Sequence, residues 1–279
     1  MSKEELVTYH LNFHQSFAPE MEAISRIVSL ADSDAGFLTK EEISEQTMIP
    51  TGKSSGKVEP HIYYAAAMRL ITFEKLDKKY ECKLTPLGRT ILIEDKYLVE
   101  NISRLLLHYF LSDKDSPARL WSYLFNDFIP LVMPQFKNEV IQNAVERQVQ
   151  KNNVNLTPFR TSYTSDLSLG NLELFRIEDF IYEVKPHRIS KENRYVYGYL
   201  LLTKWEELLS ERSEITFDEI TNRLYFGKPF LWGEREVRDA LDLMQDDGLI
   251  KVNAQLSPIT IIKNQNAAFC LDKLYSLLI

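Results

Sequence analysis

Apolar and polar residues alternate with a helical period near the N-terminus of the chain. From Met21 to Leu30 the apolar residues stand three or four positions apart, which predicts a helix over residues 18–34. Thr39 and Glu42 follow with the Thr-x-x-Glu spacing of a capping box, in which both side chains satisfy free backbone N–H groups. A short helix is therefore expected near residues 40–47.

A turn, a helix and a hairpin are predicted next. The stretch IPTGKSSGKVEP (49–60) is expected to be the turn, and KVEPHIYYAAAMRLI the helix after it. Pro60 is tolerated there because the first helical turn needs no donor from its nitrogen. TFEKL and YECKL flank DKK as a β-hairpin, and TPLGRTILI closes the segment as a helix or turn. This order predicts a winged helix-turn-helix.

The middle of the chain is expected to be helical. YLVENISRLLLHYFLS, PARLWSYLFNDFIPLV and FKNEVIQNAVERQVQKNN each carry apolar residues three and four positions apart. Residues 153–175 are polar and rich in turn-forming residues, which predicts an irregular connection.

The last part of the chain repeats the first in outline. YVYGYLLLTKWEELLSER predicts a helix, although the alternating tyrosines of RYVYGYLL leave a strand open, and Thr216 and Glu219 form a second capping box. EREVRDALDLMQDDG predicts a third helix, and LIKV and ITII predict strands. We therefore expect a mostly α fold with minor β: winged-helix units over residues 1–96 and 196–279, and a helical middle region over residues 97–195.

Charge is unevenly distributed between these segments. The net charge of the chain is −7, but residues 49–96 hold nine Lys and Arg against six acidic residues, which leaves the rest at −10. The helix EREVRDALDLMQDDG carries six acidic residues against two arginines, so phosphates would repel it. It is expected to be structural or to bind protein, whereas the basic first unit favours nucleic acid.

Composition indicates a soluble globular protein. Apolar residues make up 44% and charged residues 26% of the chain, no apolar run approaches 18 residues, and MSKEELVTYHL lacks the apolar core of a signal peptide. Two distant cysteines form neither a C-x-x-C motif nor an expected disulfide. A cytoplasmic location with no membrane partner is expected.

The 49–60 stretch is similar in composition to a nucleotide-binding loop, but its spacing is wrong. A P-loop needs G-x-x-x-x-G-K-[ST] after a buried strand. Gly56-Lys57 precedes Val58, which cannot bind magnesium, and Gly52-Lys53 has Thr47 where the first glycine belongs. Because lysines and serines surround a helix N-terminus here, the expected ligand is the phosphate backbone of a nucleic acid.

Candidate DNA contacts lie on the turn, the next helix and the hairpin. On a helix, Lys57, His61 and Tyr64 share one face, opposite Val58 and Ile62. The alternatives are a winged helix used for protein contact and a hairpin whose lysines are merely solvated. The residues expected to contact DNA are Lys53, Ser54, Ser55, Lys57, His61, Tyr64, Lys75, Lys78 and Lys79.

Motifs for catalysis, metal binding or cofactor binding are not found. There is no G-x-S-x-G, and His10 and His14, four residues apart, have no acidic third ligand nearby in sequence. We therefore expect no enzyme activity, no metal and no cofactor. Acidic residues dispersed in the sequence could still converge in space, which leaves a nuclease open.

Several blocks, in order, resemble the bacterial family known as domain of unknown function 4007. They are NFHQSF (12–17), LTKEEISEQTMIPTGKSSGKVEPHIYYAAAMRLI (38–71), LTPLGRTILIEDKYL (84–98), TSYTSDLSLGNLELF (161–175) and YVYGYLLLTKWEELL with ITFDEI (195–220). The resemblance implies no established enzymatic activity. It implies a place in bacterial anti-phage islands, beside sulfur-transfer enzymes of the phosphoadenosine-phosphosulfate-reductase type, and hence DNA phosphorothioation or related defence.

Together these features predict a non-catalytic DNA-binding accessory protein of a bacterial anti-phage defence or DNA-modification system. Its expected partners are double-stranded DNA and a protein of that system, and a homodimer is open. The alternative is a protein–protein adaptor that recruits a sulfur-transfer or modification enzyme; a nuclease is the third hypothesis.

Overall fold

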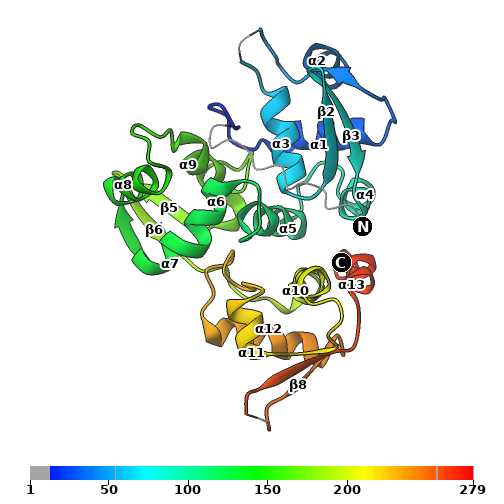
Figure 1. The fold of residues 1–279 in the computed structure, drawn as a ribbon, viewed down its shortest axis with the longest axis vertical. Helices are drawn as coiled ribbons and strands as arrows, with labels where there is room; N and C mark the ends of the chain where they lie inside the picture. The colour runs from blue at the N-terminus through cyan, green and yellow to red at the C-terminus, as the bar shows by residue number, and fades with distance from the viewer. Residues whose placement is uncertain (1–12, 54, 256, 279) are drawn as a thin grey trace. The chain divides into compact units, whose positions relative to one another are not determined.

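The computed structural model describes residues 13–53, 55–255 and 257–278, and the chain divides into two compact units, Met1–Lys185 and Pro186–Ile279 (Figure 1). Both units combine helices with small three-stranded antiparallel sheets, so the prediction of a mostly α fold with minor β is confirmed. The division into residues 1–96, 97–195 and 196–279 stays a prediction. None of the described helices is long and apolar enough to cross a membrane.

The N-terminal part of the first unit follows the predicted order of elements. The hairpin of β2 and β3 closes through a two-residue turn, Asp77-Lys78, with positive φ at both residues. Strand β1 pairs with β3, which gives the sheet order β1-β3-β2. The elements are α1 (Met21–Ala31), β1 (Leu38–Thr39), α2 (Lys40–Thr47), α3 (Val58–Ala67), β2 (Ile71–Leu76), β3 (Lys79–Leu84) and α4 (Pro86–Glu94).

The core of this part forms where α1 packs against α3. Ile24 and Ile27 of α1 and Ile62 and Ala65 of α3 are fully buried, as their helical spacing predicts. Helix α4 approaches the chain closely at Gly88, where a Cβ atom would lie 1.9 Å from the Leu70 carbonyl oxygen. Only glycine fits at this contact.

The middle segment contains a third sheet that the sequence pattern did not predict. Its strands β4 (Gln135–Lys137), β5 (Phe175–Glu178) and β6 (Ile181–Val184) pair in the order β4-β6-β5. With only three or four residues each, the strands are too short for an alternating pattern. The surrounding helices are α5 (Asn101–Ser112), α6 (Arg119–Tyr123), the π-helix η1 (Leu124–Phe128), α7 (Ile129–Val132), α8 (Asn138–Val149), α9 (Thr157–Thr164) and the 3₁₀-helix η2 (Gly170–Leu172).

The second unit has the same succession of helices and strands as residues 21–94. Its sheet order β7-β9-β8 corresponds to β1-β3-β2, and RYVYGYLL is the start of a helix rather than a strand. Both predicted capping boxes are present, at Thr39 with Glu42 and at Thr216 with Glu219. The elements are η3 (Lys191–Asn193), α10 (Arg194–Leu208), β7 (Glu214–Thr216), α11 (Phe217–Asn222), α12 (Glu234–Asp246), β8 (Ile250–Asn253), β9 (Thr260–Lys263) and α13 (Ala267–Lys273).

Candidate nucleic-acid interface

The turn between α2 and α3 is fixed by hydrogen bonds to its backbone carbonyls and displays Lys53 and Ser55. Both residues are exposed, and Ser54 lies outside the described residues. The Lys57 N–H donates to the Pro50 carbonyl at 2.8 Å, and Lys40 Nζ donates to the carbonyl of Gly52 at 2.7 Å and to that of Lys53 at 3.2 Å. The role of Lys40 was not predictable from the sequence, because a lysine inside a helix pattern gives no sign that it binds carbonyls twelve and thirteen residues away.

The hairpin displays the other three predicted lysines, and they differ in how they are paired. Lys75, Lys78 and Lys79 are all exposed. Lys75 Nζ lies 2.7 Å from the Glu59 carboxylate, whereas the described part of the chain offers Lys78 and Lys79 no ion pair within 4 Å. The positive charge of Lys75 is therefore partly neutralised, whereas Lys78 in the hairpin turn and Lys79 beside it remain available to an external anion.

Glu59, in the first turn of α3, is the acid that neutralises Lys75. Burial alone would raise the pKa of this carboxyl, but hydrogen bonds from Lys75 and the Tyr80 hydroxyl outweigh it and lower the pKa. Glu59 is therefore an anion at neutral pH, and its negative charge weakens the attraction between the hairpin lysines and a phosphate.

Lys57 is also paired within the protein. Its Nζ lies 2.6 and 2.9 Å from the two carboxylate oxygens of Glu20, and its side chain is half-buried. A phosphate would have to compete with Glu20 for this ammonium group, so Lys57 is a weaker candidate contact than Lys53.

His61 and Tyr64 do not face solvent, and the expectation that they contact DNA is wrong. Both are 0% exposed. The Tyr64 hydroxyl donates to the Phe17 carbonyl at 3.0 Å, and His61 Nε2 accepts the Glu20 N–H at 3.1 Å. Burial lowers the pKa of His61 and raises that of Tyr64, so both are neutral. Their polar atoms hold the segment before α1 onto α3.

Helix α3 as a whole presents no open face. Every one of its ten residues is buried or half-buried. The helix packs against α1 (Figure 1). Its partly exposed residues Glu59 and Tyr63 contact Lys75 and Phe73 of strand β2. A helix covered on these sides cannot enter a major groove, so direct base reading by α3 is not available in this conformation.

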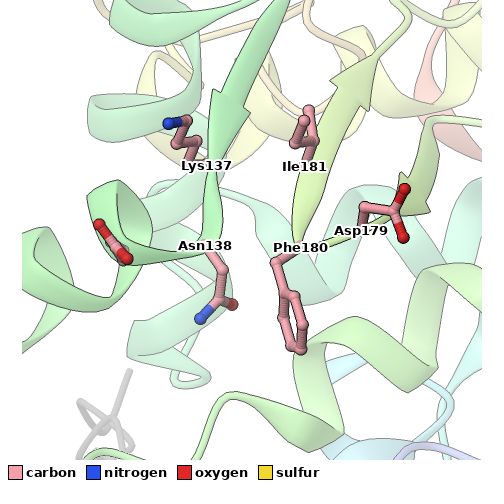
Figure 2. Close-up of a pocket in the computed structure, with 6 residues that line it drawn as sticks. Lys137, Asn138, Asp179, Phe180 and Ile181 are labelled. Atoms are coloured by element: carbon pink, nitrogen blue, oxygen red, sulfur yellow. The ribbon is translucent and has the colours of Figure 1, made fainter.

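A pocket lies elsewhere in the first unit and contains none of the predicted residues. It has a volume of about 440 Å³ and is lined by Lys137, Asn138, Glu139, Asp179, Phe180 and Ile181. Figure 2 shows the Asn138 and Phe180 side chains extending to one side, and the Asn138 N–H donates to the Phe180 carbonyl at 2.7 Å. With one lysine and two carboxylates, its lining favours no particular ligand charge.

The described residues contain no group of three or more His, Cys, Asp and Glu side chains placed to hold a metal ion. His14 is buried, and His10 lies outside the described residues. Burial raises the pKa of both Cys82 and Cys270 to about 12, so neither thiol is a nucleophile at neutral pH.

Two solved structures are similar to this chain in fold. They are titled "SspB crystal structure" and "Magnesium ion-bound SspB crystal structure", with TM-scores of 0.71 and 0.70. Each is 17% identical in sequence, and each alignment covers 96% of this chain and 86% of the other. No curated protein matches the chain. The family described as "Protein of unknown function (DUF4007)" matches residues 12–171, which is more than half of the chain, and the protein therefore belongs to this family.

Proposed function

We propose that this protein is a non-catalytic, DNA-binding accessory protein, and that its lysines contact the phosphate backbone of a duplex. The observation that carries the proposal is the group of exposed lysines on the turn and the hairpin, Lys53, Lys78 and Lys79, in a chain of net charge −7. The elements of residues 21–94 and of the second unit are proposed to be winged-helix units, of which the first would bind DNA.

The proposed contacts are to phosphates and not to bases. Lysines on a turn and a hairpin tip can reach a backbone, while the buried α3 has no side chain to present to base edges. Binding would therefore depend strongly on salt and weakly on DNA sequence. Ser55 and the partly neutralised Lys57 and Lys75 would add weaker contacts.

The proposed setting is the bacterial cytoplasm, in an anti-phage defence or phosphorothioation-type DNA-modification system. The resemblance of the sequence blocks to the family supports this setting, because it implies a place beside sulfur-transfer enzymes in anti-phage islands. In such a system the protein would hold DNA and recruit a modification enzyme.

The alternative is an adaptor that binds only proteins, and the second unit favours it. Helix α12 is the third helix of the second unit and corresponds to α3 of the first unit. Unlike α3, it has one face that is exposed to solvent. Asp239, Asp242 and Asp246 are exposed at spacings of three and four residues, so they share one face of the helix. Such a face would repel DNA and attract a basic protein surface.

The test is duplex DNA binding as a function of salt. In fluorescence anisotropy from 20 to 200 mM salt, the wild type should bind a short duplex with little sequence preference. The variant Lys53→Glu/Lys78→Glu/Lys79→Glu should reduce the slope of log K against log [salt] by about 3. A matched control, Lys137→Glu/Lys151→Glu/Lys185→Glu, reverses three other exposed lysines of the same unit and should bind far better than the first variant.

Two outcomes would replace the proposal. If the wild type does not bind at 20 mM salt, or both triple variants lose binding equally, the DNA-contacting role is wrong and the adaptor stands. If the wild type nicks supercoiled DNA with Mg²⁺ and not with EDTA, the protein is a nuclease; one fold relative carries magnesium in its title, so this arm belongs in the experiment.

A further inference from the structure

Arg104 is a buried charged residue that has no acidic partner among the described residues. It lies in α5, is 7% exposed, and its side chain contacts only backbone carbonyls, with no ion pair, within the part of the chain that the structure describes. Its Nε donates to the Leu98 carbonyl at 3.0 Å and its Nη1 donates to the Asp166 carbonyl at 2.9 Å. Arginine carries five N–H donors and a permanent charge, and buried charges in proteins are normally paired with an opposite charge.

The two carbonyls belong to two loops that are far apart in sequence. One precedes α5 and the other follows α9, and each falls in a block that resembles the family, LTPLGRTILIEDKYL and TSYTSDLSLGNLELF. Beside each bonded carbonyl stands a large, exposed apolar side chain: Val99 is 60% exposed and Leu167 is 73% exposed. We call Val99, Arg104 and Leu167 the Arg104 surface.

Internal hydrogen bonds hold both loops in place. The buried carboxylate of Asp95 accepts the N–H groups of Val99 and Glu100, both at 3.0 Å, and the Ser103 hydroxyl. Asp95 is therefore occupied within its own loop. On the other side, the Leu167 carbonyl accepts the Met21 N–H at 2.9 Å, at the start of α1. Because the loops are fixed, a ligand would pay little entropy to order them.

We infer that the Arg104 surface is a docking site for a protein partner that presents a carboxylate flanked by apolar side chains. The carboxylate would pair with Arg104, and the apolar groups would cover Val99 and Leu167. The inference goes beyond the DNA-binding role and does not depend on it.

The surroundings favour a protein over DNA as the occupant. The neighbouring residues Glu100 and Asp166 are acidic, and a duplex would bring a continuous row of phosphates past them. An acidic side chain brings a single charge, for which the guanidinium group is a match in charge and geometry. Burying the exposed valine and leucine side chains against apolar groups is also favourable, whereas these side chains make no favourable interaction with a phosphate.

The experiment uses NMR on the full-length protein, labelled so that arginine Nε–H groups and methyl groups are visible. The probe is the peptide acetyl-Leu-Glu-Leu-amide, and acetyl-Leu-Gln-Leu-amide is the neutral control. The glutamate peptide should shift the Arg104 Nε–H signal and the Val99 and Leu167 methyl signals saturably, and the glutamine peptide should bind at least tenfold more weakly. Inorganic phosphate and a short DNA duplex are titrated separately in the same way, as probes for a phosphate site.

Variants separate docking from folding. Arg104→Gln should abolish the shifts, but it also removes two hydrogen bonds and could unfold the loops. Val99→Ser/Leu167→Ser changes only exposed side chains and should weaken the glutamate peptide roughly tenfold. Leu131→Ser/Val140→Ser, at two other exposed apolar residues, should leave peptide binding unchanged.

Three results would overturn the inference. The first is an equal response to the glutamate and glutamine peptides, and the second is no response to either. The third is a shift of the Arg104 signal by phosphate or duplex without one by the glutamate peptide, which would make the surface a phosphate site.

Discussion

At the scale of single residues, His187 is a half-buried base whose Nε2 atom is buried and finds no hydrogen-bond partner among the described residues. Its main chain is held by Phe230 and Trp232, since its N–H donates to the Phe230 carbonyl and its carbonyl accepts the Trp232 indole N–H. Burial lowers the pKa of its imidazole from 6.5 to about 4. His187 is also the only histidine of residues 186–279.

This histidine should make the second unit acid-sensitive. Below pH 6.5 the unfolded chain binds a proton at His187 and the folded chain does not, so stability is complete above pH 6.5 and falls toward pH 4. The loss from this group should reach up to about 3 kcal/mol. Urea unfolding of a Trp121→Phe background, in which fluorescence reports only Trp205 and Trp232, measures it.

The control for this prediction is His187→Gln in the same background. Both proteins share every carboxylate, so the difference in their unfolding free energies isolates the imidazole. The unfolding free energy of the variant should increase relative to that of the parent as the pH falls from 7 to 4.5. A difference that stays constant across this range would show that the His187 imidazole takes up a proton equally in the folded and unfolded states, contrary to the partial burial of its ring.

At the scale of helices and strands, local signals were predictable and long-range packing was not. The capping boxes and the β2–β3 hairpin were predicted correctly, because each is specified within a few neighbouring residues. The burial of His61 and Tyr64 depends on Glu20 and Phe17, which are more than forty positions away in the sequence. A helical pattern alone does not show whether these two side chains face the protein core or a DNA ligand. Among the proposed contacts, the exposure of the hairpin lysines was predictable from their position at a tip.

The two capping boxes should each stabilise their helix by a similar amount. Thr39 and Thr216 each accept the N–H of the glutamate three residues on at 3.2 Å, and that glutamate accepts the threonine N–H. Thr39→Ala and Thr216→Ala should each cost about 1 kcal/mol in chemical denaturation, while the serine variants should cost much less. Equal losses for alanine and serine would assign the effect to the threonine methyl group instead.

At the scale of the whole molecule, the chain consists of two units, and the boundary between them in the sequence falls between Lys185 and Pro186. Residues 185–190 belong to no helix or strand, and Arg188 is exposed. Each unit has its own apolar core, which is the usual requirement for folding alone. By contrast, Phe159 packs against Trp121 and Phe125, so the core of the first unit joins distant segments of that unit.

Cutting the chain between the units should therefore leave both folded. With a specific protease site inserted after Lys185, the separated products should keep near-ultraviolet circular dichroism and dispersed NMR signals. The same site inserted after Lys151 divides the core of the first unit and should abolish its tertiary signal. Loss of structure in both products of the first cut would mean that neither unit is autonomous.

The closed surroundings of α3 have a consequence for genetics. Replacements within its HIYYAAA segment would lower the amount of native protein in the cell, and a genetic screen for loss of the protein's function would recover them readily. Such alleles would tend to be temperature-sensitive and would mark the helix as essential without identifying any ligand. Alleles at Lys53 or Lys78 that abolish the function at normal protein abundance would be the informative class.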